Sequence, residues 1–167
     1  MFVNGKSLLK AAPIKDMAIS KMTYKGTSYG LAEAGYDIRI KQSIAFYPNA
    51  KNIVIQHKLQ DPVETLRNTN FTIASAIEEF QMPNNLVGQV TDKSSWARKG
   101  LSVFNTVIEP GWNGFLTLEL VYHGSEPLFI EAGQGIAQVL FGCLVEPGDY
   151  GNGKYQNQED KPVKSRK

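Results

Sequence analysis

The chain has 167 residues, of which 42% are hydrophobic and 20% charged, and its net charge is +2. These values are typical of one globular domain with its own core, and so small a charge excludes a broad basic surface for nucleic acid. Its single cysteine, Cys143, excludes an intrachain disulfide and favours a reducing compartment. No apolar run is long enough to span a bilayer. We therefore expect a cytoplasmic protein without membrane or nucleic-acid partners.

Short apolar runs separated by turn residues predict an all-β protein. In chain order the expected strands are Tyr36–Ile40, Ile53–Gln56, Phe71–Ser75, Leu86–Thr91, Ser102–Phe104, Phe115–Tyr122, Leu128–Ile130 and Ala137–Leu144. Turn signals stand between them at Pro83-Asn84-Asn85, Pro110–Gly114 and Gly133-Gln134-Gly135. Many short strands with such turns are typical of a β-sandwich or barrel.

Two short segments, Lys6–Lys10 and Ser94–Lys99, are predicted to be helical. In the second, Ser94 or Ser95 can cap the first turn, and Gly100 can end the last turn. The free N–H groups at the start of a helix attract anions. Hydroxyls beside basic side chains therefore suit a phosphorylated ligand.

The composition changes after Pro147, where glycines punctuate a segment that carries two tyrosines, a lysine and glutamines. Such contacts suit a lid that orders over a ligand. We therefore expect residues 1–147 to form a single β-barrel domain, followed by a mobile C-terminal lid and basic tail in residues 148–167. The last basic residues, which are Lys161, Lys164, Arg166 and Lys167, are interpreted as a solvated tail.

A carboxylate, Glu119, stands in the strand Phe115–Tyr122. Alternation places Leu116, Leu118 and Leu120 on one face, and Thr117, Glu119 and Val121 on the other. Glu119 either faces water on a half-exposed sheet or serves in a site, and periodicity leaves both interpretations open.

Several catalytic signatures are absent from the sequence. Zinc-dependent deaminases need H-x-E and P-C-x-x-C spacings, but the chain has only Cys143 and two histidines, His57 and His123, so we expect no catalytic zinc. No G-x-S-x-G or G-x-x-x-x-G-K-[ST] motif occurs, although a Ser-His-Asp arrangement stays open. Both histidines are interpreted as surface or loop residues, and Cys143 as a small core residue.

Five segments, in order along the chain, resemble the motifs of the dCTP deaminase family in the dUTPase-like superfamily. Ser28–Arg39 resembles S-Y-G…G-Y-D-[IV]-R, and Lys93–Arg98 resembles [KR]-S-[ST]-x-A-R. Glu109–Glu119 resembles [DE]-P-x-[WF]-x-G-x-x-T-L-E. Gly135–Phe141 resembles G-x-[AG]-Q-x-x-F, and Gly153–Gln158 resembles the K-Y-x-x-Q lid.

This resemblance implies a distorted jelly-roll β-barrel of the dUTPase-like type with one or two short helices. It also implies a homotrimer whose active sites are shared between neighbouring subunits. The reaction would be hydrolytic deamination of dCTP to dUTP and ammonia, with Mg²⁺ bound to the triphosphate and no other metal. The chain resembles a compact member of the family, and a phage-encoded one would act in the host cytoplasm.

The resemblance also implies site residues by motif position. Glu119 matches the catalytic glutamate, and Ser94 and Arg98 match the residues that support it and the attacking water. Lys93 and Ser95 match phosphate contacts, and Glu109 matches an acidic position that meets the sugar or base. The other residues expected to bind substrate are Trp96, Ala97, Thr117, Leu118, Gln138 and the lid residues Tyr150, Lys154 and Gln158.

The sequence leaves several activities open. A bifunctional enzyme would convert dCTP to dUMP and pyrophosphate, and a dUTPase would use the Glu109 position to activate water. A non-catalytic nucleotide-binding regulator is the alternative from another class. The short segment around Asn105–Val107, the choice between dCTP, dCMP or a modified cytosine, and feedback by dTTP are not determined by the sequence.

Overall fold

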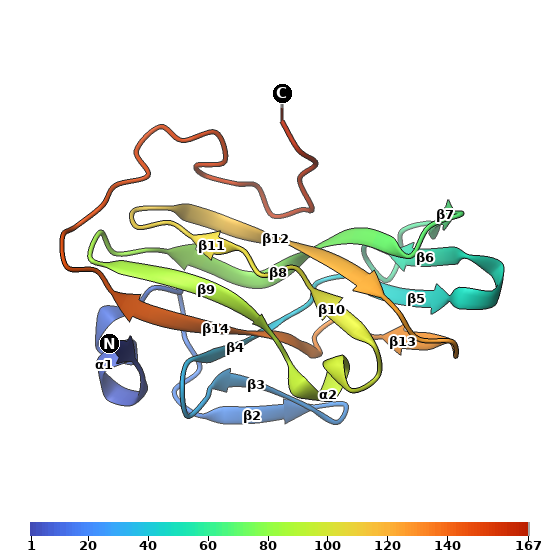
Figure 1. Cartoon of the computed structure of the whole chain (residues 1–167), viewed down its shortest axis with the longest axis horizontal. Helices are drawn as coiled ribbons and strands as arrows, with labels where there is room; N and C mark the ends of the chain where they lie inside the picture. Colours follow the sequence, from blue (N-terminus) through green and yellow to red (C-terminus); the bar gives the residue numbers. More distant parts are fainter. Residues whose placement is uncertain (167) are drawn as a thin grey trace.

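The computed structural model describes residues 1–166 and consists mainly of β-strands (Figure 1). The strands are β1 (Phe2–Val3), β2 (Lys21–Tyr24), β3 (Thr27–Leu31), β4 (Tyr36–Arg39), β5 (Ser43–Tyr47), β6 (Asn52–Gln56), β7 (Glu64–Arg67), β8 (Phe71–Gln81), β9 (Leu86–Asp92), β10 (Leu101–Val103), β11 (Val107–Ile108), β12 (Asn113–Tyr122), β13 (Leu128–Ile130) and β14 (Gly135–Cys143). The helices are α1 (Gly5–Ala11), α2 (Ser94–Ala97) and the 3-10 turn η1 (Pro48–Ala50). The predicted all-β class is therefore confirmed. Within residues 1–166, no helix is both long and apolar enough to cross a membrane.

The strands form three antiparallel sheets. The largest follows the order β11-β9-β14-β4-β3-β2, with β1 added to β14. A second sheet pairs β12 with β10 on one side and β8 on the other, and a third has the order β13-β5-β6-β7. Figure 1 shows the long strands β8, β9, β12 and β14 running side by side through the middle of the molecule. Their inward faces enclose the core.

The core is filled by aliphatic and aromatic side chains from all three sheets. Its largest fully buried members include Tyr36, Ile38, Phe46, Ile53, Phe80, Leu101 and Phe141. Each such side chain contributes about 1.5–3 kcal/mol by leaving water. These buried side chains are the main source of stability for the three sheets, and Tyr150 of the C-terminal segment packs against them.

A β-bulge in β12 changes the alternation expected for that strand. Its register against β8 shifts between Phe115 and Thr117. Leu116, Thr117 and Leu118 are consequently all buried, whereas strict alternation puts every second residue on one face. Beyond the bulge, Leu118 and Leu120 face the core as predicted, and Glu119 lies on the opposite face.

Strand β8 is longer than predicted, and its predicted end at Ser75 is wrong because charged residues after Ser75 interrupt the apolar pattern. The strand continues to Gln81 because Glu78, at 4% exposure, is held by Arg39. Arg39 Nε donates to Glu78 Oε1 at 2.8 Å, and the Arg39 backbone N–H donates to Oε2 at 2.9 Å. Burial raises the pKa of Glu78, and the Arg39 guanidinium opposes that rise. Strand β2 had no apolar run to indicate it, because all four of its residues face solvent.

Both expected helices are present, although α2 is shorter than predicted. Its N-cap is Lys93, and no side chain caps it, so the prediction that a serine caps the helix is wrong. Gly100 follows the helix with a φ of 90°, and its N–H donates to Ala97 O at 2.9 Å. Cys143 is exposed at the end of β14 and is not a core residue.

Candidate functional site

A cavity of about 990 Å³ lies against the first half of β12. Its floor comes from three strands, with Thr117 and Glu119 on β12, Phe71 and Ile73 on β8, and Ile108 on β11. The register of the sheet explains this grouping, because Glu119 pairs with Ile73 and Val121 pairs with Phe71. This volume is sufficient for a nucleotide-sized ligand.

Glu119 is the half-buried carboxyl in this floor. Burial raises the pKa of the Glu119 carboxyl above its ordinary range, since water no longer solvates the charged form well. Within residues 1–166, no cation forms an ion pair with it. A carboxyl that retains a proton closer to neutral pH is suited to accept a proton and return it.

The C-terminal segment forms the opposite wall of the cavity (red, above β11 and β12 in Figure 1). Thr117 Oγ1 accepts a hydrogen bond from Gln158 Nε2 and a second, at 3.0 Å, from the Val163 backbone N–H. The Gln158 carbonyl accepts from Phe115 N at 3.0 Å, and Gln158 forms a parallel bridge with Gly114. The segment is therefore bound to β12 by both backbone and side-chain contacts.

The turn before β12 provides further contacts to the same segment. Trp112, which is 5% exposed, donates its indole N–H to Tyr155 O at 2.7 Å. Gln156 Oε1 accepts from Asn113 N at 2.7 Å, and Gln156 Nε2 donates to Gly111 O at 2.9 Å. In this conformation, residues 148–166 cover the cavity, and their predicted mobility stays a prediction.

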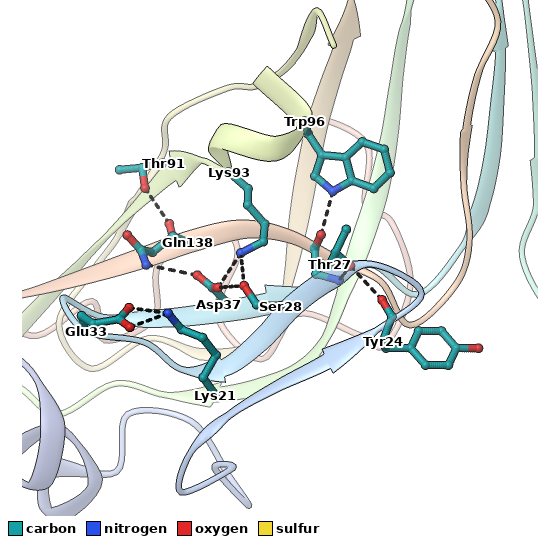
Figure 2. Close-up of polar contacts among 11 residues, drawn as sticks. Lys21, Tyr24, Thr27, Ser28, Glu33, Asp37, Thr91, Lys93, Trp96 and Gln138 are labelled. Carbon is teal, nitrogen blue, oxygen red and sulfur yellow. Dashed lines mark hydrogen bonds and ion pairs between the residues drawn. The ribbon is translucent and has the colours of Figure 1, made fainter. Parts of the chain in front are cut away.

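The segment around α2 forms a separate polar network (Figure 2). Lys93 Nζ donates to Asp37 Oδ2 at 2.5 Å and to Ser28 Oγ at 2.8 Å. Gln138 Nε2 donates to the other Asp37 oxygen at 3.1 Å. The Trp96 indole N–H donates to Gly135 O at 2.7 Å and anchors α2 to β14. Lys93 thus points into the protein, where the side chain of Asp37 is 4% exposed.

The structure brings together only some of the predicted site residues. The cavity is lined by five of them: Glu109, Thr117, Glu119, Tyr150 and Gln158. The others are outside its lining, namely Lys93, Ser94, Ser95, Trp96, Ala97 and Arg98 at α2, Leu118 in the core, Gln138 beside Asp37, and Lys154 in the C-terminal segment. Within one chain, α2 and Glu119 therefore do not share this cavity.

Other cavity residues had no signal in the motifs. His57 and Glu64, from either side of the β6–β7 connection, line the cavity, with His57 Nε2 at 3.1 Å from Glu64 Oε2. Phe71 and Ile73 could be assigned to the cavity only from the register of β8 against β12, which pairs Ile73 with Glu119. Within residues 1–166, no group of three or more His, Cys, Asp or Glu side chains is placed to hold a metal ion.

The chain has a dUTPase-like fold. A solved structure of EIAV dUTPase superposes with a TM-score of 0.51 at 20% identity, covering 92% of this chain and 99% of that one. The crystal structure of 2'-deoxycytidine 5'-triphosphate deaminase from Agrobacterium tumefaciens superposes with a TM-score of 0.57 at 15% identity. The superposed region covers 89% of this chain and 50% of the longer deaminase chain. At these identities the likeness concerns the fold.

Sequence comparison then identifies the family. The dCTP deaminase-like family model matches residues 8–143. A dCTP deaminase from Chlamydia muridarum is 36% identical over 146 residues, which cover 79% of this chain and 76% of that protein. A dCTP deaminase from Herpetosiphon aurantiacus is 37% identical over 144 residues, or 78% of each chain. The chain belongs to the dCTP deaminase-like family, as its motifs predicted.

Proposed function

We propose that this protein hydrolyses dCTP to dUTP and ammonia. Family membership supports the proposal, and so do the relatives named dCTP deaminase. The observation that carries it is Glu119, a half-buried carboxyl with a raised pKa in the wall of a large cavity. The carboxyl lies at the position where the family motif has its T-L-E sequence.

In the proposed reaction, Glu119 takes a proton from a water molecule as the water oxygen bonds to C4 of cytosine. Glu119 gives this proton to the ring nitrogen N3, then takes the second proton from the new C4 hydroxyl and gives it to the amine, so that the C4–N bond breaks, the C4 carbonyl forms and ammonia leaves. Proton transfer of this kind contributes about 10²–10⁴-fold to the rate. Mg²⁺ enters with the substrate on its phosphate oxygens.

We propose that a neighbouring subunit of a homotrimer completes the site with Ser94 and Arg98. Glu119 has no cation partner within residues 1–166, and α2 lies outside the cavity of its own chain. Phe104, whose N–H donates to Glu119 O, is 53% exposed, and Val107 in the cavity lining is 54% exposed, so both offer apolar contacts to a second copy.

Mixing two inactive variants tests the shared site. In a shared arrangement, refolding Glu119→Gln together with Arg98→Ala recreates intact sites in about one quarter of the positions, because each site takes its two residues from different chains. Each variant refolded alone serves as the control. Absence of any recovered activity, with mixed oligomers present, would refute the shared site.

The activity itself is tested by incubation with dCTP, dUTP and dCMP plus Mg²⁺, with ammonia and phosphate products measured together. We expect ammonia and dUTP from dCTP, and near-complete loss in Glu119→Gln. Ammonia with dUMP and pyrophosphate would indicate the bifunctional reaction, which Glu109 in the same cavity favours. Pyrophosphate from dUTP without ammonia from dCTP would overturn the proposal.

A further inference from the structure

Lys161 and Lys164 were interpreted as part of a solvated tail, but the structure places them at the cavity, and Lys167 lies outside the described residues. Residues 161–165 line the same cavity as Glu119. Pro162 and Val163 are partly buried there, whereas the side chains of Lys161 and Lys164 remain exposed. The tail is thus a wall of the site.

Two anchors hold Lys164 in place, one on each side along the chain. Immediately before it, the Val163 N–H donates to Thr117 Oγ1 at 3.0 Å. Two residues after it, the Arg166 N–H donates to Tyr155 Oη at 3.2 Å, and Arg166 Nη1 donates to Lys154 O at 2.8 Å. The backbone around Lys164 is therefore fixed relative to β12 while its flexible side chain is free to reach a ligand.

The charges of the cavity give Lys164 a distinct role. The lining contains three carboxylates, Glu64, Glu109 and Glu119, which would repel a polyphosphate. Two other basic side chains of the lining already have carboxylate partners: His57 Nε2 lies 3.1 Å from Glu64 Oε2, and the Lys161 ammonium pairs with Glu159 at 2.5 Å. Lys164 forms no ion pair with any carboxylate of residues 1–166.

We propose that Lys164 is a substrate-binding residue that contacts the triphosphate when the tail is docked on Thr117. The inference rests on the proposed function, since it assumes a nucleoside triphosphate as the ligand. An ammonium group is a compact charge that pairs well with phosphate oxygens. The exposed side chain also makes the contact sensitive to salt.

Lys164→Ala tests the proposal. We expect the KM for dCTP to rise about fivefold, the upper end for an exposed ion pair, with kcat nearly unchanged and the effect shrinking at high salt. Lys164→Arg should retain most of the affinity. The matched control is Lys10→Ala, which removes an exposed lysine of α1 outside the cavity lining. Equal KM values for Lys164→Ala and Lys10→Ala would overturn the proposal.

A binding experiment separates this proposal from the proposed function. Calorimetry with inorganic tripolyphosphate and with deoxycytidine needs no turnover. We expect Lys164→Ala to weaken tripolyphosphate and leave deoxycytidine unchanged, and equal weakening of both would refute a phosphate contact. If the parent protein releases no ammonia from dCTP, the proposed function fails, while the tripolyphosphate result still decides the role of Lys164.

Discussion

Gly114 is a point of close approach between the C-terminal segment and β12. Its φ is 130°, and a Cβ added there would lie 2.5 Å from Gln158 N, 2.7 Å from Gln158 O and 3.0 Å from Gln158 Cα. All three atoms belong to backbone, so no side-chain rotation can relieve the clash. Gly114→Ala should therefore displace Gln158 from β12.

The free-energy cost expected for Gly114→Ala has two parts. Placing alanine at a strongly positive φ costs on the order of 1–3 kcal/mol. Moving Gln158 away also breaks its hydrogen bonds to Phe115 and Thr117, which contribute about 0.5–1.5 kcal/mol each. The second part weakens the docking of residues 148–166 on β12, because the broken hydrogen bonds join Gln158 to that strand.

Gly26→Ala is the matched control. Gly26 has a φ of 80°, and a Cβ added there meets no atom within 4 Å. It therefore shares the backbone cost without touching the C-terminal segment. Urea unfolding of both variants measures that shared cost.

Hydrogen exchange measures the docking separately. In Gly114→Ala, we expect amide protection of Phe115 and Val163 to fall about tenfold or more relative to Gly26→Ala, which corresponds to roughly 1.4 kcal/mol of lost docking. The KM for dCTP should rise in parallel. If the two variants exchange alike at both amides, the segment does not depend on this contact and the reasoning is wrong.

Three further predictions concern stability. Burial raises the pKa of Glu119, so its charged form destabilises the fold as pH rises above the ordinary value of 4.5. Glu119→Gln should therefore melt at a higher temperature than the parent at pH 7 and lose that advantage below pH 4.5, which thermal melts across pH measure. Asp37→Asn should lose about 3–5 kcal/mol in urea unfolding, because it leaves the Lys93 ammonium without its counter-charge, and a loss under 1 kcal/mol would contradict a tight pair. Trp112→Phe leaves Tyr155 O without its hydrogen-bond donor, which should cost about 1–3 kcal/mol of docking free energy. Chymotrypsin should therefore cleave at Tyr155 faster than in the parent, and an unchanged rate would count against this anchor.

Local patterns predicted much of this protein. Turn residues and short apolar runs indicated the all-β class, because backbone geometry limits where chains can turn. The run from Lys93 to Arg98 and the block ending in Glu119 identified the family. Both short helices were located, although hydroxyls beside a helix start did not become its caps.

The sequence could not predict what each of these residues faces. Lys93 was expected to bind phosphate, yet its ammonium is paired with Asp37, which is 56 residues earlier in the chain. Such pairing depends on β3, β4, β9 and β14 lying together, and the sequence has no local mark of that arrangement. The bulge at Phe115–Thr117 likewise follows from pairing with β8, and it changes which residues of β12 are buried.

The sequence by itself determined the chemistry available, namely the Glu119 carboxylate in a predicted strand, a basic hydroxyl-rich segment and a C-terminal segment rich in polar and aromatic side chains. Only the tertiary structure decided their grouping. It placed the tail beside Glu119 through a hydrogen bond between Val163 and Thr117, 46 residues apart, and it kept α2 out of that cavity. Alternation along a strand determines which face a side chain occupies, but the path of the whole chain determines what lies across from it.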